Sequence, residues 1–441
     1  MIEVTEQQIA HWLLENTGMV VSEENQAILQ QLVTQFTPLF IAAQHRLQER
    51  MDLQKANPRT AYIPPLLDEA RQKWLVESLI PAFHARGEIV IRKAYWPGAK
   101  QWALALTHDV DMVRAYSFAH VARHTPSRLF SYLRTGTHPQ DPYWNFDEVL
   151  EWYEQQSVQA SFYFLARAKE KWHFRYRLAS RPFKTLLQRI HAAGHEIGLH
   201  SSLTVFRHPR HLVKEKKRLE TLCPNPIYGM RQHYLKLTFP EAWQEIARSQ
   251  FEYDSSVGFN NALGFAMGTC FPFRPLAPDT PLVEIPLAIM DYPMMALDTP
   301  PHFPHTSRLI GDVQRLQGAL TILIHPHHLT ETHFFPYKEF LFMLVKESAA
   351  WQATLHQITI WWQLRAQLHL RLIRKGLHRY LLQLTTKQPI TNVELEIYLP
   401  TGFRLEAGNF KMVPLDPQHW RLQLPPLAPG TLQLPLEVVK R

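Results

Sequence analysis

The fold of this chain is decided by the stretch Trp102-Ala103-Leu104-Ala105-Leu106-Thr107-His108-Asp109-Val110-Asp111. A short apolar run that ends in charged side chains is typical of a buried β-strand with a polar carboxyl end. The turn-rich segment Tyr95-Trp96-Pro97-Gly98 precedes it, and the patterning before and after this segment differs. We therefore place a domain boundary near residue 98.

Short apolar runs alternate with helical patterns after this boundary. This alternation predicts parallel strands with crossover helices, in either a barrel or an open sheet. In both architectures the functional residues gather at the carboxyl ends of the strands. The predicted strands are Trp102–Thr107, Ala160–Leu165, Glu196–Leu199, Ile227–Gly229, Phe251–Tyr253, Leu282–Ile285 and Leu320–Ile324. The predicted helices are Phe146–Glu154, Phe183–Ala192, Arg210–Leu222, Phe239–Ser249 and Leu309–Leu316.

The two flanking regions have different patterns. Apolar residues recur at helical spacing through residues 1–98, which we predict to be a mainly helical region. A further helical stretch is expected from Lys338 to Leu364. Beyond it, short alternating runs separated by Pro- and Gly-containing turns predict a small antiparallel β-sandwich over residues 365–441. The central domain then covers residues 99–350.

Composition narrows the class of protein. With 441 residues, the chain exceeds what one hydrophobic core usually organises. Only Cys223 and Cys270 are present, which argues against a disulfide framework. The acidic start lacks the pattern of a secretory signal and no apolar stretch is long enough to span a bilayer, so we expect a cytoplasmic protein without a transmembrane segment.

The formal net charge of +8 favours anionic partners. Zinc-finger spacing, a Walker loop and a Gly-rich dinucleotide fingerprint are all missing from the sequence, so we expect no nucleic-acid partner. The oligomeric state does not follow from the sequence.

Asp109 and Asp111 end the first strand and point to the same side, because residues two apart in an extended chain share a face. Two carboxylates this close repel each other unless a cation lies beside them or one is protonated. A metal ligand next to a general base satisfies both carboxylates. A helix-capping role for Asp in a polar turn is the competing interpretation of this motif alone.

The same placement recurs at four later strand ends. His200 follows the strand in His195-Glu196-Ile197-Gly198-Leu199-His200, and Arg231-Gln232-His233-Tyr234 follows the next one. Asp254 and His325 end two more strands. Imidazole beside carboxylate suits zinc, iron or cobalt. The convergence predicts a metal-dependent site at the carboxyl ends of the sheet.

Over about residues 100–330, the order of these motifs resembles the polysaccharide deacetylase family, the NodB-homology domain of carbohydrate esterase family four. The resemblance is to a variant branch with Asp-x-Asp in its first motif. It also takes in Asp141-Pro142-Tyr143-Trp144-Asn145-Phe146, Ala160-Ser161-Phe162-Tyr163-Phe164 and Gly264-Phe265-Ala266-Met267-Gly268-Thr269-Cys270. It implies a distorted (β/α) barrel and a hydrolase that removes an N-acetyl or other N-acyl group from a sugar in a glycan or glycan precursor.

The resemblance also implies roles for single residues. Asp109 would be the general base for a metal-bound water, with Asp111 and His200 as metal ligands. Arg231 would orient Asp109, and Asp254 would pair with Arg231. His325 would be the general acid that protonates the leaving amine.

The third metal ligand departs from the family's pattern. A second His normally follows the first by four residues, and Thr204 occupies that position here. Threonine is a poor ligand for these metals. His233 is our preferred third ligand because it lies in a strand-end motif, with His208 or water as alternatives. We expect a divalent metal ion, with zinc preferred.

Two residues are predicted to contact substrate: Tyr234, through a backbone N–H near the oxyanion, and Trp144, by stacking on a sugar ring as neighbouring Tyr143 could also do. Two other functions remain open. One is hydrolysis of another non-peptide C–N bond, as in deformylases or allantoinase-like proteins. The other is a catalytically weak pseudoenzyme that binds glycan or protein, for which Thr204 is the main support.

Overall fold

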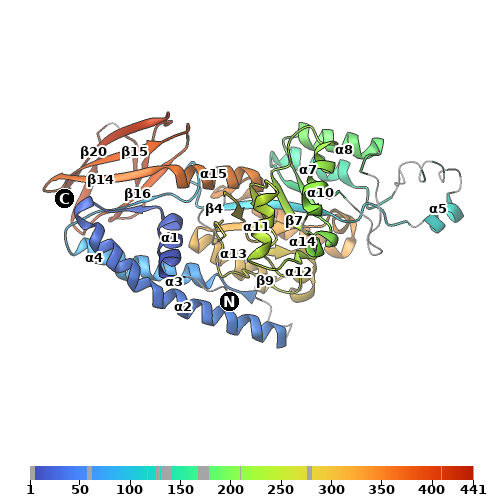
Figure 1. Ribbon diagram of the computed structural model, residues 1–441, viewed down its shortest axis with the longest axis horizontal. Coiled ribbons are helices and arrows are strands. Elements are labelled where there is room, and N and C mark those ends of the chain that lie inside the picture. The colour runs from blue at the N-terminus through green and yellow to red at the C-terminus, as the bar shows by residue number, and fades with distance from the viewer. Residues whose placement is uncertain are drawn as a thin grey trace.

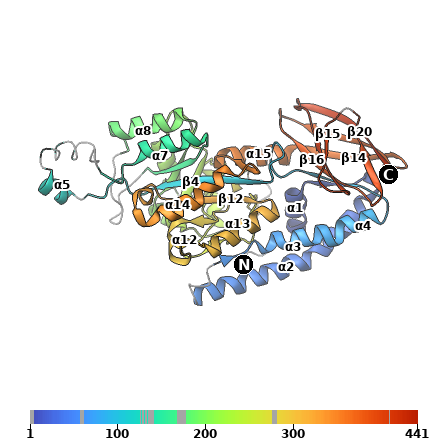
Figure 2. The ribbon, with the colours of Figure 1, turned by 180° about the vertical axis from the view of Figure 1, so that it is seen from behind.

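The computed structural model describes residues 5–56, 62–116, 118–125, 127, 130, 133, 141–166, 178–208, 210–275, 281–408 and 410–440. The molecule is elongated, with a β-sandwich at one end and an α/β domain toward the other (Figures 1 and 2). Helix α2, Gln26–Ala56, runs beneath both parts. Among the described helices, none is both long enough and apolar enough to cross a membrane.

The α/β domain is built on one parallel sheet. Its strands lie in the order β10-β8-β7-β6-β5-β4-β12-β11, and β13 pairs with the first residues of β4. The bounds are β4, Trp102–Val110; β5, Ser161–Leu165; β6, Glu196–Ser201; β7, Gly229–Gln232; β8, Tyr253–Asp254; β10, Val283–Glu284; β11, Ile289–Met290; β12, Ala319–Leu323; and β13, Ala350–Gln352. All seven predicted strands overlap strands of this sheet.

The segment 283–290 closes the sheet into a ring. Its first part pairs with β8, where Val283 lies opposite Tyr253, and its last part pairs with β12, where Ile289 lies opposite Ile322. One short segment thus supplies the strands at both ends of the order, β10 beside β8 and β11 beside β12. The prediction of a distorted (β/α) barrel is confirmed.

Helices cover the outside of the barrel, and α8 illustrates how an apolar stripe packs a helix against the sheet. In α8, the residues Phe183, Leu186, Leu187 and Ile190 are buried, at the spacing that places them on one face. The helices are α7, Phe146–Gln156; α8, Arg181–Ala192; α9, Leu203–Arg207; α10, His211–Glu220; α11, Glu241–Arg248; α12, Asp291–Leu297; α13, Pro304–Leu316; and α14, Phe335–Met343. The short helix α5, Phe118–His124, lies at the end of the molecule far from the sandwich (Figure 1).

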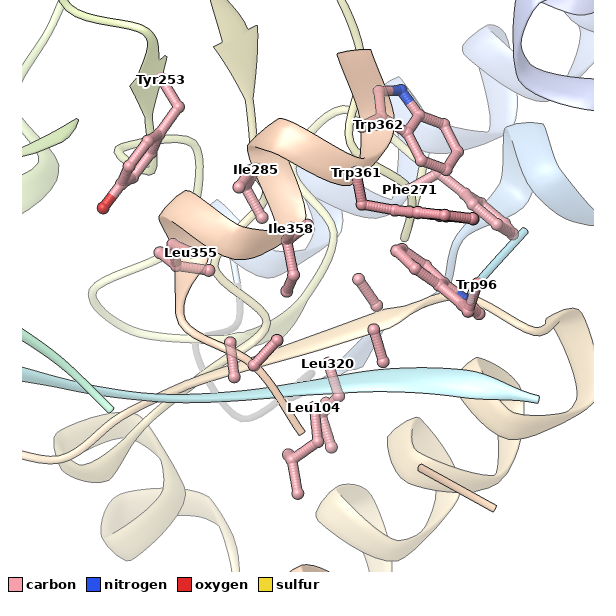
Figure 3. Packing of buried hydrophobic residues seen from close by; sticks show 14 of the residues in the cluster. Trp96, Leu104, Tyr253, Phe271, Ile285, Leu320, Leu355, Ile358, Trp361 and Trp362 are labelled. Atoms are coloured by element: carbon pink, nitrogen blue, oxygen red, sulfur yellow. The ribbon is translucent and has the colours of Figure 1, made fainter. Parts of the chain in front are cut away.

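Helix α15, Leu355–Gln367, covers the amino-terminal end of the barrel. Its Trp361 and Trp362 gather with Trp96 and Phe271, and its first turns lie over Leu104 and Leu320 of adjacent strands (Figure 3). The first backbone N–H groups of α15 are satisfied by the barrel. The N–H of Leu355 donates to Ser161 Oγ and that of His356 to Glu196 Oε2, each at 3.0 Å. The prediction of one helical stretch from Lys338 to Leu364 is wrong, because β13 separates α14 from α15.

The N-terminal region forms its own core around Phe36, Trp74 and Phe83. Its helices are α1, Glu6–Thr17; α2; α3, Leu66–Trp74; and α4, Ile80–His84, with a π-helical turn at Leu75–Leu79 between the last two. The region also holds strands: β1, Met19–Val20; β2, Tyr62–Ile63, which pairs with β9, Leu263–Gly264; and β3, Val90–Lys93.

The β-sandwich consists of two sheets, in the orders β1-β3-β16-β19-β18 and β14-β15-β20-β17. The first sheet includes strands β1 and β3 from before residue 98, tied to β16 by a buried ion pair of Arg92 with Glu396. The C-terminal strands are β14, His369–Gly376; β15, Arg379–Thr386; β16, Glu394–Tyr398; β17, Phe403–Glu406; β18, Met412–Pro414; β19, His419–Gln423; and β20, Gly430–Lys440. The division into three domains stays a prediction.

Gly229 provides a test of barrel packing. A Cβ at this position would lie 1.8 Å from Cζ of Tyr253, whose hydroxyl is fixed by Tyr163 and Glu196. We expect Gly229→Ala to lower the free energy of unfolding by about 1–3 kcal/mol, the usual cost of overpacking. Gly311, inside α13, has open space around the same atom, so Gly311→Ala should be neutral or stabilising by up to about 1 kcal/mol. Urea denaturation measures both; equal effects would contradict this packing.

Candidate metal centre

Asp111, His200 and His233 meet at the carboxyl end of the barrel. Asp111 directly follows β4, His200 lies in β6, and His233 begins the turn after β7. His200 Nε2 is 3.1 Å from Asp111 Oδ1, and His233 Nε2 is 3.2 Å from Asp111 Oδ2. Ligands about 2.0–2.2 Å from one zinc ion stand roughly 3.0–3.6 Å apart. The three side chains have the spacing of a shared cation site.

The tautomer of His200 suits a cation site. Its Nδ1 lies 2.9 Å from the carbonyl oxygen of Arg231, which can only accept, so Nδ1 carries the hydrogen. The lone pair of Nε2 then faces a carboxylate. Asp111 Oδ1 is buried and receives no hydrogen bond of acceptable geometry from the described residues. A metal ion or a proton must lie between the two groups, and the residues fit a divalent metal.

The electrostatics of this cluster favour positive charge. Burial acts to lower the pKa of His200, but Asp109 and Asp111 outweigh it and raise that pKa above its usual value. Burial acts to raise the pKa of Asp111, but His200, His233 and His325 hold it well below its usual range. The Asp111 side chain stays 17% exposed, which leaves the site open to solvent.

Asp109 has a different partner from Asp111. Its Oδ1 accepts from Nη1 of Arg231 at 3.0 Å, and its Oδ2 lies 3.7 Å from His200 Nε2. Arg231 is fully buried and donates from Nη1 to Thr107 Oγ1, from Nε to the carbonyl of Ser255 and from Nη2 to Ser255 Oγ. Asp109 is therefore held as the partner of a buried cation, while Asp111 faces the imidazoles.

Among the described residues, Asp254 forms neither a hydrogen bond nor an ion pair with Arg231, and the pairing predicted from the sequence stays a prediction. The guanidinium of Arg231 directs four of its five N–H groups to Asp109, Thr107 and Ser255. Asp254 is fully buried behind Ser255, and its Oδ1 accepts from Ser256 Oγ at 2.5 Å. Its charge still acts on Arg231 through space.

His325 lies across the cluster, with Nε2 3.6 Å from Asp111 Oδ2. Its Nδ1 is 2.9 Å from Oδ1 of Asp291, a residue that the sequence interpretation missed. Burial acts to lower the pKa of His325, but Asp291 raises it well above its usual value. Asp291 follows the short apolar run that ends at Met290, so the strand-end rule would have found it had the preceding strand been extended beyond Ile285.

Asp291, His325 and His328 form a second group with metal-ligand spacing. Hydrogen bonds already fill the Asp291 carboxylate: the backbone N–H of Tyr292 donates to Oδ1 and that of His325 to Oδ2, in addition to Nδ1 of His325 and His328. This pattern fixes both imidazoles with hydrogen on Nδ1. The group orients His325 and is not arranged to hold a cation.

The other candidate residues divide between the site and its surroundings. Tyr234 is 52% exposed, has a left-handed backbone (φ 57°) and packs its ring 4.1 Å from that of His233.

The ring of Tyr143 lies 5.1 Å from the ring of His327, near His325. Trp144 instead packs edge-on against Phe146 and Phe183. The stacking role of Trp144 stays a prediction. His208 is exposed beside His211 and is not part of the metal cluster.

Comparisons with known proteins returned no matching family model and no matching curated protein. Among solved structures, the chain is similar to a "putative polysaccharide deacetylase" from Mycobacterium smegmatis, with a TM-score of 0.42, 19% identity and coverage of 60% of this chain and 91% of the other. It is also similar to an allantoinase, with a TM-score of 0.41, 14% identity and coverage of 61% of this chain and 93% of the other. A peptidoglycan N-acetylglucosamine deacetylase matches with a TM-score of 0.34, 15% identity and coverage of 59% of this chain and 89% of the other. Polysaccharide deacetylases are thus among the structures it resembles, as the motifs predicted.

Metal titration separates the two candidates for the third ligand. We expect wild type to bind one equivalent of Zn²⁺ and His233→Ala to bind it at least roughly tenfold more weakly, because even orienting partners of a metal ligand contribute about that much. His208→Ala is the matched control and should bind like wild type. Isothermal titration calorimetry measures both. Normal binding by His233→Ala would remove His233 from the ligand set.

Proposed function

We propose that this protein is a metal-dependent hydrolase that removes an N-acetyl or other N-acyl group from a sugar in a glycan or glycan precursor. The observation that supports it is that two neighbouring carboxylates have different partners. Asp109 is paired with Arg231, and Asp111 faces His200 and His233. An acid, His325, lies on the other side of Asp111. Base, metal ligands and acid are all provided by strand ends.

Amide hydrolysis assigns a step to each of these groups. Asp109 accepts a proton from water as the water oxygen forms a bond to the acyl carbon. The C–N bond then breaks, and His325 gives its proton to the leaving nitrogen, so that the products are a carboxylic acid and a free amine. Asp291 supports this direction of transfer because it keeps the proton on His325 until the leaving group needs it.

Asp111, His200 and His233 would hold the ion, and zinc is our preferred candidate because two imidazoles and a carboxylate are ligands that zinc accepts. When bound, such an ion supplies Lewis-acid polarisation and lowers the pKa of water.

The rim of the site supports a sugar substrate. Tyr234 and Tyr292 are 52% and 46% exposed, beside His233 and His325 respectively, where their ring centroids lie 4.1 and 5.2 Å from the imidazoles. An exposed aromatic ring offers an apolar surface together with a polar hydroxyl. A sugar ring, with apolar faces and a polar edge, is complementary to two such walls.

Acetate release tests the proposal. Zinc-loaded wild type incubated with N-acetylglucosamine oligomers should release acetate and free amine in equal amounts. His325→Gln should lower kcat by about 10²-fold or more, because it removes the proton donor for the leaving nitrogen. His333→Gln is the control, since His333 is an exposed residue that pairs with Glu331. Hydrolysis of a cyclic amide or formamide instead of the sugars would favour the alternative C–N hydrolase, and no turnover of any of them would favour the pseudoenzyme.

A further inference from the structure

Two buried carboxyl groups, on Asp254 and Glu284, lie side by side behind the candidate site. Strands β8 and β10 are parallel neighbours, and their register places Glu284 opposite Asp254. Both residues are completely buried. Two ionised carboxylates in direct contact without water would repel each other strongly.

The hydrogen-bond donors around this pair reach three of its four carboxyl oxygens and leave one without a donor. Trp243 Nε1 donates to Glu284 Oε2 at 2.8 Å, and the N–H of Val257 donates to Oε1 at 3.0 Å. Ser256 Oγ donates to Asp254 Oδ1. Asp254 Oδ2 is buried and has no donor among the described residues. Glu284 is the side chain that contacts Asp254, and a carboxyl hydrogen would complete a bond between them.

The pair is connected to Arg231 through two serines. Ser256 Oγ, which donates to Asp254, accepts from the backbone N–H of Gln232 at 2.9 Å. Ser255 accepts from Nε and Nη2 of Arg231. The segment that Asp254 anchors therefore holds both the side chain of Arg231 and the backbone next to it.

We propose that Asp254 and Glu284 share a single proton in the folded protein, and that this pair, carrying one negative charge, positions Arg231 for Asp109. Glu284 then joins Asp254 as a positioning residue. The positioning of Arg231 for Asp109 rests on the proposed function, because it takes Asp109 to be the base. The shared proton is independent of that function. With one proton the pair carries a single negative charge, on which Arg231 acts through space. Two ionised carboxylates would repel each other and leave Asp254 Oδ2 without a donor.

Titration of the pair agrees with this arrangement. Burial raises the pKa of Asp254 to about 6 and, together with the charge of Asp254, raises that of Glu284 well above its usual value. The charged group that acts on Asp254 from β7 is Arg231; helix α11 contributes the indole of Trp243, and residues 255–257 contribute hydroxyl and amide groups. The folded pair binds a proton that the unfolded chain releases, so stability should fall as the pH rises above the ordinary carboxyl values.

Infrared spectroscopy at pH 7.5 tests the shared proton without metal or substrate. Wild type should show the carbonyl stretch of a protonated carboxylic acid, and Glu284→Gln should lack it. Asp298→Asn is the matched control: Asp298 is buried, but three donors from His305 and Thr306 satisfy its oxygens, so the band should stay. If Glu284→Gln does not fold, Asp254→Asn replaces it with the same expectation. A missing band in wild type, or a band that survives both substitutions, overturns the proposal.

Two further readouts separate a positioning role from a structural one. In urea titrations from pH 6 to 8, the unfolding constant of wild type relative to that of Glu284→Gln should rise by up to about tenfold per pH unit, the effect of one proton. With an active enzyme, Glu284→Ala should lower kcat, and Glu284→Gln should lower it less. KM should change little in both variants. Equal pH slopes would overturn the shared proton, and an unchanged kcat in Glu284→Ala would overturn the positioning role. Failure of the proposed function would leave the infrared and urea results intact.

Discussion

The buried guanidinium of Arg231 is the group on which the arrangement of the site depends. A charge without access to water must be paired and hydrogen-bonded, and Arg231 meets this requirement through Asp109, Thr107 and Ser255. Its own carbonyl accepts from Nδ1 of His200, which turns the other imidazole nitrogen toward Asp111. One residue thus joins three strands and helps to give different partners to two carboxylates that are two positions apart.

The barrel interior supports this residue from below. The guanidinium of Arg231 lies 4.7 Å from the ring of Tyr163, whose hydroxyl bonds to that of Tyr253 at 2.7 Å. Tyr253 in turn donates to Glu196, which also accepts from the first turn of α15. A continuous set of aromatic and polar contacts therefore runs from the helix that covers the amino-terminal end of the barrel to the site at the other end. Cation–π contacts of this buried kind contribute on the order of 1–2 kcal/mol each.

The fold and the location of the site could be predicted from the sequence because both depend on local patterns. Apolar runs that end in Asp109, His200, Arg231 and His325 identify strands and their carboxyl ends without tertiary information. The partner of Asp254 could not be predicted, because Glu284 becomes its neighbour only through the register of β8 and β10. The same limit applies to β1 and β3, whose pairing with β16 joins residues from opposite ends of the chain. Asp291 was missed because the strand predicted in this segment ended at Ile285, before the short strand β11 that precedes Asp291.

The central claim, that Asp109 and Asp111 perform different tasks, is tested most directly by measuring bound Zn²⁺ and acetate release for Asp109→Asn and Asp111→Asn under the same conditions. Both substitutions keep the shape of the side chain and remove its charge. The account predicts that Asp109→Asn keeps its metal and loses turnover, whereas Asp111→Asn loses both. Loss of metal from Asp109→Asn to the same extent as from Asp111→Asn, or wild-type turnover by either variant, would contradict it.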